Sequence, residues 1–240
     1  MGSFFYTLAL RYADGSMTEN PKAALFSRSR CPHCQSSIGP IHLIPILGYM
    51  IQKGKCRNCE GKISPIYPAM EILYGLIASL FAWKIGMTIY SLNLYLLAGI
   101  ALCIAVIDIK SLIIPDSLVI AFVMLSIYPI VLNYNIADNL FGLLALFSFF
   151  IIILLLFPGS FGGGDLKFGS AIGLLTGLEM SIIVLEVSLV SGAIIGIIYA
   201  LKTRKSLRTK IPFAPFLSLG LTVSLLYGRD ILLIYYRILF

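Results

Sequence analysis

The sequence predicts an all-α, polytopic membrane protein with about eight membrane helices and a small zinc-ribbon-like insert. Three observations support this fold class. Of the 240 residues, 59% are hydrophobic and only 12% are charged, whereas soluble globular proteins carry about 25% charged residues. Most apolar residues fall in runs of about 20, the length that a helix needs to cross a bilayer. The one sizeable polar region, residues 11–64, contains two CxxC pairs.

The apolar runs follow one another with short connections, so each is predicted to be a separate helix. Full spans are expected at residues 66–85, 89–108, 117–134, 139–157, 180–201 and 216–236. A weaker, glycine-rich span covers residues 166–178. Residues 1–10 form a short N-terminal membrane segment, too short to cross the bilayer alone. We therefore predict three parts: the segment 1–10, a polar domain 11–64 and a transmembrane domain 65–240.

The basic residues predict how the chain is oriented. Eight of the 18 Lys and Arg residues lie between Arg11 and Lys62, and five more lie between Lys202 and Lys210. Cytoplasmic loops of membrane proteins carry an excess of Lys and Arg. Placing residues 11–64 in the cytoplasm and alternating sides at each span puts the second basic cluster there too. Membrane orientation thus explains the net charge of +7 without nucleic-acid binding.

Four cysteines, Cys31, Cys34, Cys56 and Cys59, are spaced as two knuckles of a Cys₄ zinc site. Two disulfides are the alternative, which a reducing cytoplasm disfavours. An insert of about 50 residues seldom builds an adequate core, which also favours a metal that stabilises it. Nearby glycines at positions 39, 54 and 61 are expected at the tight turns. We predict a structural zinc ion, since four cysteine ligands leave no open coordination position.

Two carboxylates lie at the ends of predicted spans. Asp108 ends an apolar run, and Asp165 opens the span after three glycines. The predicted topology places both at the cytoplasmic side, and ionisable residues in spans are usually functional. Two close carboxyls share one proton, so that one can activate water while the other protonates a carbonyl. Proton-relay carboxylates of transporters have the same pattern. Asp116, which follows Pro115, is read instead as a helix N-cap.

Helix ends and glycines suggest how this pair is arranged. Gly169, Gly173 and Gly177 form a small-residue stripe, which is expected to let a neighbouring helix bring Asp108 close to Asp165. Asp165 begins its helix, where the macrodipole favours an anion, and Asp108 ends its helix, where the dipole favours a neutral acid. This suggests Asp165 as the base and Asp108 as its protonated partner.

With these motifs in order along nearly the whole chain, the sequence resembles the type IV prepilin peptidases, which are membrane aspartyl proteases with a Gly-x-Gly-Asp motif. The matching segments are 2–4 (GSF), 29–34 (SRCPHC), 44–47 (IPIL), 54–59 (GKCRNC), 67–71 (YPAME), 108–116 (DIKSLIIPD), 162–167 (GGGDLK) and 211–216 (IPFAPF). The resemblance implies that Asp108 and Asp165 are catalytic. It marks Gly162, Gly164, Lys167, Pro212 and Pro215 as motif or positioning residues, and Glu71 as a possible substrate or cofactor ligand. The alternative for Glu71 is a partner for a basic side chain or for helix-start amides.

The resemblance also implies a function. Such enzymes lie in the bacterial inner membrane and cut the basic leader from prepilins or pseudopilins at the cytoplasmic face. Many also methylate the new N-terminus with S-adenosylmethionine, for which the polar segment shows no G-x-G-x-x-G signature. The expected partners are therefore these substrates and the lipid bilayer, in type IV pilus assembly or protein secretion. A proton-coupled transporter and a zinc-stabilised scaffold are the competing functions, and the sequence leaves the oligomeric state open.

Overall fold

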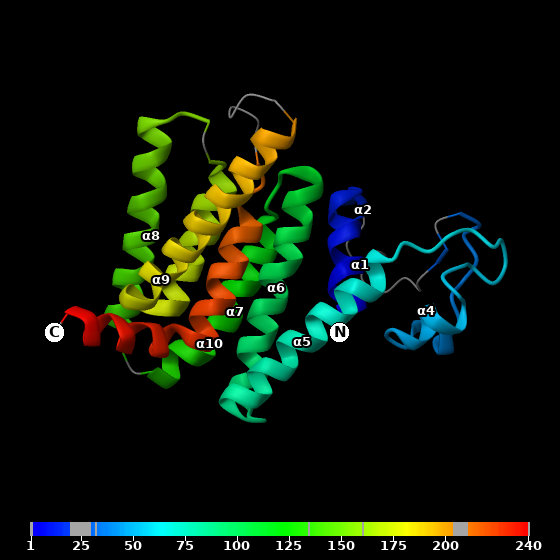
Figure 1. Cartoon of the computed structure of the whole chain (residues 1–240), viewed down its shortest axis with the longest axis horizontal. Coiled ribbons are helices and arrows are strands. Elements are labelled where there is room, and N and C mark those ends of the chain that lie inside the picture. Colours follow the sequence, from blue (N-terminus) through cyan, green and yellow to red (C-terminus); the bar gives the residue numbers. More distant parts are fainter. Residues whose placement is uncertain are drawn as a thin grey trace. The chain divides into compact units, whose positions relative to one another are not determined.

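The computed structural model describes residues 2–19, 30–31, 33–133, 135–159, 161–203 and 211–239, and every regular element among them is helical. The elements are α1 (Gly2–Ala13), α2 (Ser16–Glu19), η1 (Pro40–Leu43), α4 (Leu47–Ile51), α5 (Ile66–Ile85), α6 (Ile89–Ser111), α7 (Asp116–Asn133), α8 (Ile136–Leu156), α9 (Gly163–Thr203) and α10 (Ala214–Leu239) (Figure 1). The helices divide between two compact units, Met1–Leu80 and Phe81–Phe240, which are described separately below. The predicted domain boundaries at residues 10 and 64 stay a prediction.

The first unit contains α1, the cysteine knuckles and most of α5. Aromatic side chains join α1 to α5. Phe5 stacks on Tyr74 with ring centroids 5.4 Å apart, and Tyr6 meets Tyr67 edge to face at 4.9 Å. Aromatic pairs at these separations add favourable contact energy beyond the apolar area that they bury. The short N-terminal helix is thus packed against a helix long enough to cross a bilayer.

The predicted fold class is confirmed, because six of the described helices are long and apolar enough to cross a membrane. These are α5 to α10. Two of the predicted spans, residues 166–178 and 180–201, lie within the single element α9. At Gly177 the backbone of α9 leaves the helical region, with φ 76° and ψ 178°. The carboxylate of Asp138, from α8, accepts the N–H of Leu178 at 3.1 Å and so caps the second half of α9.

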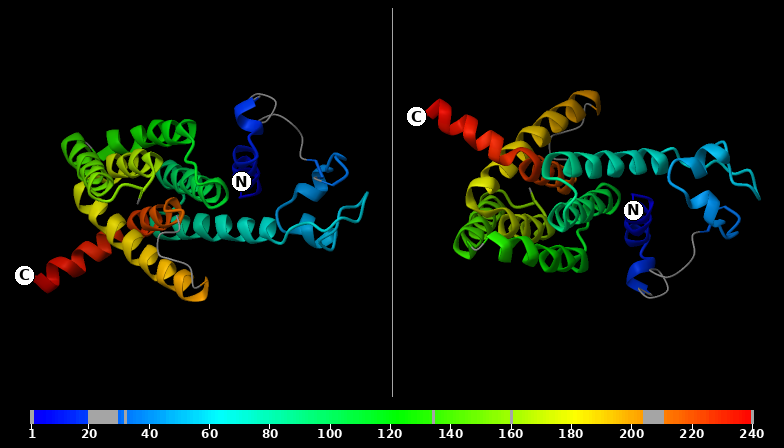
Figure 2. Two further views of the ribbon diagram at one scale, coloured as in Figure 1. Left: turned by 90° about the horizontal axis from the view of Figure 1, so that it is seen from above. Right: turned by 90° about the horizontal axis from the view of Figure 1, so that it is seen from below.

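In the second unit, α9 packs against α7, α8 and α10, and α6 packs against α7 and α10. Helices α6 to α9 run side by side, while the C-terminal end of α10 projects past them (Figures 1 and 2). The N-terminus of α6 is held by a capping box between Thr88 and Ser91. Its middle is nearly continuous buried surface, and the hydroxyl of Ser218 on α10 donates to the carbonyl of Ala101 at 2.7 Å. Helix α6 therefore forms the core of this unit.

The glycine stripe of α9 faces a different helix from the one expected. A Cβ atom on Gly173 would lie 2.3 Å from the carbonyl oxygen of Gly142 on α8, and one on Gly169 would lie 2.3 Å from the ring of Phe150, also on α8. These glycines let α8 and α9 approach closely. The expectation that they bring Asp108 on α6 toward Asp165 is wrong, because the stripe covers the α8 side of α9.

Candidate active site and metal centre

Asp108 lies in the last turn of α6, where its side chain is buried. Its Oδ2 accepts the backbone N–H of Ala214, the first residue of α10, at 3.0 Å. First-turn amides have no partner within their own helix, so a carboxylate can satisfy one of them. Pro215 follows directly and has no N–H. The carboxyl of Asp108 is thereby fixed to the N-terminus of α10.

Asp165 is the third residue of α9 and folds back on the turn that precedes it. Its Oδ2 accepts the N–H of Gly162 at 2.9 Å, which is half of a capping box. Its Oδ1 is buried and has no hydrogen-bond partner among the described residues. One oxygen of Asp165 is therefore anchored by the glycine turn, and the other is a buried oxygen without a partner among the described residues, at which a carboxyl proton can reside.

The segments that carry the two carboxyls meet at this end of the bundle. Aromatic side chains next to both anchors hold the segments together. Phe161 precedes Gly162, Phe213 precedes Ala214, and their rings meet with centroids 4.7 Å apart. Phe150 of α8 contacts both rings, at 5.3 Å and 6.1 Å. The structure thus brings together Asp108 and Asp165, which are 57 residues apart in the sequence, and adds an aromatic cluster that sequence analysis did not identify.

The macrodipole argument for the roles of the two aspartates is not supported by this geometry. Asp165 lies at the N-terminus of its own helix, as expected, but Asp108 lies at the N-terminus of α10 as well as at the end of α6. Each carboxylate accepts a backbone N–H at a helix start. The helix-end positions therefore do not distinguish the base from the acid.

The three glycines before Asp165 are not equivalent. A Cβ atom at Gly164 would lie 2.8 Å from the Cβ of Ile114, in the loop that joins α6 to α7. A Cβ atom at Gly162 would make an ordinary contact of 3.5 Å with Asp165, and one at Gly163 would meet nothing within 4 Å. Gly164 is thus the position where the loop after Asp108 packs closely on the turn that carries Asp165.

The remaining motif residues lie around the segments that carry Asp108 and Asp165. Lys167 forms an ion pair with Asp116, the first residue of α7, at 2.8 Å, and both side chains are more than half exposed. This contact links the second aspartate of the 108–116 motif to the lysine of the 162–167 motif. Pro212 lies two residues before α10 and Pro215 is the second residue of this helix, where a proline in the first turn presets the helical backbone.

Glu71 takes the structural role that sequence analysis gave as its alternative. Its Oε2 accepts the N–H of Ile46 at 2.7 Å. Ile46 is the N-cap of α4 and has a positive φ of 63°, a strained conformation for a β-branched residue. The carboxylate of Glu71 therefore binds a helix-start amide of the polar insert.

Four cysteines of the first unit converge as the sequence predicts. The Sγ atoms of Cys31, Cys34, Cys56 and Cys59 all lie within 4.8 Å of one another. Cys31 and Cys59 are separated by 3.8 Å, and Cys34 and Cys56 by 3.9 Å. A tetrahedral zinc ion with Zn–S bonds of about 2.3 Å places its sulfur ligands about 3.8 Å apart. The four thiols thus fit a single metal ion.

The two knuckles have the same local fold. The N–H of Gln35 donates to the backbone carbonyl of Cys31 and that of Glu60 to the backbone carbonyl of Cys56, both at 2.9 Å, and both donor residues have positive φ values near 57°. The left-handed turn positions are thus held by Gln35 and Glu60, and of the three expected glycines only Gly54 has a positive φ.

Hydrogen bonds within the knuckles also lower the pKa of two of the four thiols. Backbone N–H groups of Cys59 and Asn58 lower the pKa of the Cys56 thiol to about 6. The pKa of Cys34 is lowered by a hydrogen bond from the Ser36 side chain. The thiolate is the form that binds metals, so the knuckles favour the ligating state of these two cysteines.

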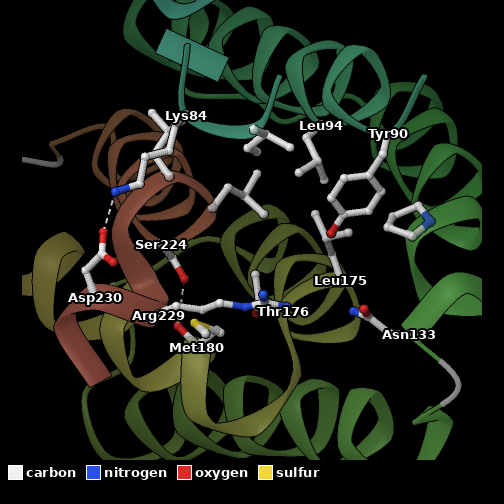
Figure 3. A pocket seen from close by; sticks show the side chains of 14 residues that line it. Lys84, Tyr90, Leu94, Asn133, Leu175, Thr176, Met180, Ser224, Arg229 and Asp230 are labelled. Atoms are coloured by element: carbon white, nitrogen blue, oxygen red, sulfur yellow. Dashed lines mark hydrogen bonds and ion pairs between the residues drawn. The ribbon is translucent and has the colours of Figure 1, made fainter. Parts of the chain in front are cut away.

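A cavity of about 360 Å³ lies at the opposite end of α6 from Asp108 (Figure 3). Tyr90 and Leu94 of α6 line one side, and Arg229 of α10 crosses the cavity toward Thr176 on α9 (Figure 3). At its rim, Lys84 pairs with Asp230. This cavity contains neither predicted catalytic carboxylate.

The basic residues from 204 to 210, which were used to predict the orientation, lie outside the described residues, so the orientation stays a prediction.

Comparison with known proteins gives a consistent result. Residues 1–85 match the family described as bacterial peptidase A24 N-terminal domain, and residues 95–197 match the type IV leader peptidase family. A protein of Bacillus subtilis (strain 168) named prepilin leader peptidase/N-methyltransferase is 31% identical, over 99% of this chain and 94% of its own length. Proteins of the same name from Legionella pneumophila (31% identical, 89% of this chain, 77% of theirs) and Pseudomonas aeruginosa (29%, 88%, 77%) are also similar.

No solved structure matches the chain. Both family-model matches end before α10, so the amide of Ala214 lies outside the residues that these two models describe. The contact between this amide and Asp108 is therefore information that the structure adds to the comparisons.

Proposed function

The chain belongs to the type IV leader peptidase family, and from this membership we propose that it is a multi-pass membrane endopeptidase that removes the leader of prepilins and methylates the new N-terminus. Similarity over 99% of the chain to a prepilin leader peptidase/N-methyltransferase supports both activities. The observation that carries the mechanism is the approach of two anchored carboxyls, Asp108 and Asp165, at one end of the helical bundle.

We assign Asp108 and Asp165 as the catalytic pair. The two carboxyls hold one proton between them, because two adjacent carboxylates resist double ionisation. The ionised carboxylate takes a proton from a water molecule, and the oxygen of this water attacks the scissile carbonyl carbon. The protonated member gives its proton to the carbonyl oxygen, producing a neutral tetrahedral diol. Collapse of the diol breaks the C–N bond, a proton passes to the leaving nitrogen, and the shared proton is restored to the pair.

The backbone contacts have a defined part in this mechanism. The amides of Ala214 and Gly162 each hold one oxygen of a catalytic carboxyl. Fixing the carboxyls removes the need to reorganise them during reaction. The Oδ1 of Asp165, which has no partner among the described residues, is the oxygen that we assign to proton transfer.

The substrate suits a site at the end of a bundle. We place the catalytic carboxyls and the cysteine insert on the cytoplasmic side of the inner membrane, following the basic residues of the sequence. A prepilin carries an apolar helix after its leader. That helix can lie in the bilayer beside the bundle, so that the cleavage point emerges at the end where Asp108 and Asp165 lie.

The cysteine site is proposed to bind zinc in a structural role. Four thiolate ligands complete a tetrahedral site, and such sites stabilise small domains. The methyl donor is proposed to be S-adenosylmethionine, which supplies the methyl group to the amine that cleavage exposes. Glu71 is not assigned to this donor, because its carboxylate is bound to the amide of Ile46.

The test is cleavage of a purified prepilin by the full-length protein in lipid, compared with the Asp108→Asn and Asp165→Asn variants. Each variant is expected to lose about 10²–10⁴-fold in rate, because each removes one member of the acid–base pair. Asp230→Asn is the matched control, since this carboxylate pairs with Lys84 at the opposite end of α6. Cleavage at the wild-type rate by either active-site variant would exclude the mechanism.

Proton flux without cleavage would instead favour the transporter function. Addition of a methyl group to the product, read by mass spectrometry, tests the second activity.

A further inference from the structure

The insert of the first unit exposes an unusual amount of apolar surface. Seven large apolar residues in one 11-residue stretch are exposed, with values from 37% for Ile46 to 65% for Met50. We call them the apolar patch: Ile41, Leu43, Ile44, Ile46, Leu47, Met50 and Ile51. Contiguous exposed apolar surface generally marks a protein or membrane contact.

The patch is a folded unit. Helices η1 and α4 contact each other, and the N–H of Gly48 donates to the carbonyl of Ile44 at 2.8 Å. A Cβ atom at Gly48 would lie 2.2 Å from the carbonyl oxygen of His42. The two short helices therefore pack with backbone against backbone, which fixes their apolar side chains on the outside.

The patch is attached to a membrane helix. The amide of Ile46, within the patch, is held by the carboxylate of Glu71 at 2.7 Å. Glu71 is the sixth residue of α5, a helix long and apolar enough to cross the bilayer. Because this contact lies in the second turn of α5, it holds the patch close to the level at which α5 enters the membrane.

The charges that follow the patch identify its partner. Lys53, Lys55 and Lys62 are exposed directly beyond α4, and Glu60 is the one acidic residue between positions 33 and 62. Basic residues beside an apolar segment are typical of binding to anionic lipid headgroups. A second copy of the chain would place these lysines against one another, which disfavours it as the occupant.

We propose that the apolar patch, with Lys53, Lys55 and Lys62, is a membrane-surface anchor that inserts into the boundary between headgroups and acyl chains beside α5. Such segments enter to a depth of about 5–10 Å. The anchor holds the insert against the bilayer, and Glu71 serves as its tether. This surface is distinct from the proposed active site, and its existence does not depend on the leader-cleaving activity.

The anchor can be tested by fluorescence, since the chain has a single tryptophan, Trp83. In a Trp83→Phe background, Met50→Trp places a reporter in the patch, and Arg57→Trp places a control reporter on an exposed polar position of the second knuckle. The full-length proteins are reconstituted in phosphatidylglycerol–phosphatidylcholine nanodiscs, with or without lipids brominated near the headgroup. The patch reporter is expected to be quenched more strongly than the control reporter, because its segment enters the lipid to a depth of about 5–10 Å.

Two further arms sharpen the test. Quenching of the patch reporter is expected to fall when phosphatidylglycerol is omitted or when Lys53→Gln and Lys55→Gln are introduced, because both changes remove charge attraction. An unchanged circular dichroism spectrum and melting temperature show that each variant is folded. A patch reporter that lipid bromine does not quench, or one quenched no more than the control, overturns the proposal. Quenching that depends on protein concentration instead of bromine indicates a second copy and overturns it as well. None of these readouts requires cleavage, so they are independent of the proposed function.

Discussion

The carboxylate of Asp108, at the end of α6, accepts the N–H of Ala214, the first residue of α10, at 3.0 Å. The two residues are 106 positions apart in the sequence. This contact makes the start of α10 part of the proposed active site, and it leads to the first prediction.

Replacing Ala214 with proline removes the N–H that Asp108 accepts, while a proline at the first position of a helix is well tolerated. We expect kcat to fall about 10- to 100-fold, the worth of a hydrogen bond to a charged group, with little change in KM. Ala214→Gly keeps the N–H and is expected to stay near the wild-type rate. Steady-state kinetics on a prepilin peptide distinguish the variants. An equal fall of kcat in the Ala214→Pro and Ala214→Gly variants would show that the rate depends on side-chain packing and not on the amide of residue 214.

Adding a methyl group at Gly164 is expected to disrupt the active-site turn, since the new Cβ would lie 2.8 Å from the Cβ of Ile114. Overpacking of this kind costs about 1–3 kcal/mol, and activity should fall as the loop after Asp108 is displaced. Gly163→Ala is the matched control, because a Cβ there meets nothing within 4 Å. Thermal unfolding and cleavage rates should separate the two variants. A Gly164→Ala variant with the wild-type melting temperature and cleavage rate would contradict the close packing of the loop after Asp108 on the turn before Asp165.

The ion pair between Lys167 and Asp116 is expected to position α7 against α9 with only modest energy. Exposed pairs contribute about 0–1 kcal/mol, and both side chains are more than half exposed. Lys167→Met and Asp116→Asn should each slow cleavage only a few-fold, and their effects should not add. A double-mutant cycle measures this coupling. A loss as large as that of Asp108→Asn would show that Lys167 acts directly on the reacting groups.

Zinc is expected to co-purify with the chain and to stabilise the first unit. Cys59→Ser should lower both the zinc content and the melting temperature, since the site then lacks one of its four ligands. Cys103→Ser is the control, because Cys103 is buried in α6, outside the cysteine cluster. Elemental analysis and thermal unfolding give the two readouts. Full zinc content in the Cys59→Ser protein would exclude the Cys₄ assignment.

The sequence was sufficient for much of the fold. The apolar runs predicted the helices because length and hydropathy alone decide whether a segment can cross a bilayer. The CxxC spacing predicted the cysteine cluster because the two knuckles form locally. The catalytic roles of Asp108 and Asp165 stay a prediction, although the structure brings their carboxyls together.

Other features depend on tertiary geometry and were missed. The amides of Ala214 and Gly162, the contact of Gly164 with Ile114 and the packing of the Phe213 ring on Phe161 and Phe150 leave no periodic pattern in the sequence, although residues 162–167 and 211–216 stood out as motifs. The glycine stripe of α9 predicted close packing correctly, but a stripe of small residues does not identify the helix that packs against it. The partner proved to be α8.

The break at Gly177 has a consequence for how α9 is accommodated in the membrane. The first half of α9, residues 163–177, has 15 residues and is therefore about 22 Å long, whereas the hydrocarbon core of a bilayer is about 30 Å thick. Its two ends cannot both reach the headgroups of a bilayer of ordinary thickness. Irregular backbone at membrane depth is tolerated only where protein buries it and satisfies its polar groups. Gly177 is buried, and the carboxylate of Asp138 accepts the N–H of Leu178 just beyond the break, so α8 supplies what the interrupted helix lacks inside the bilayer.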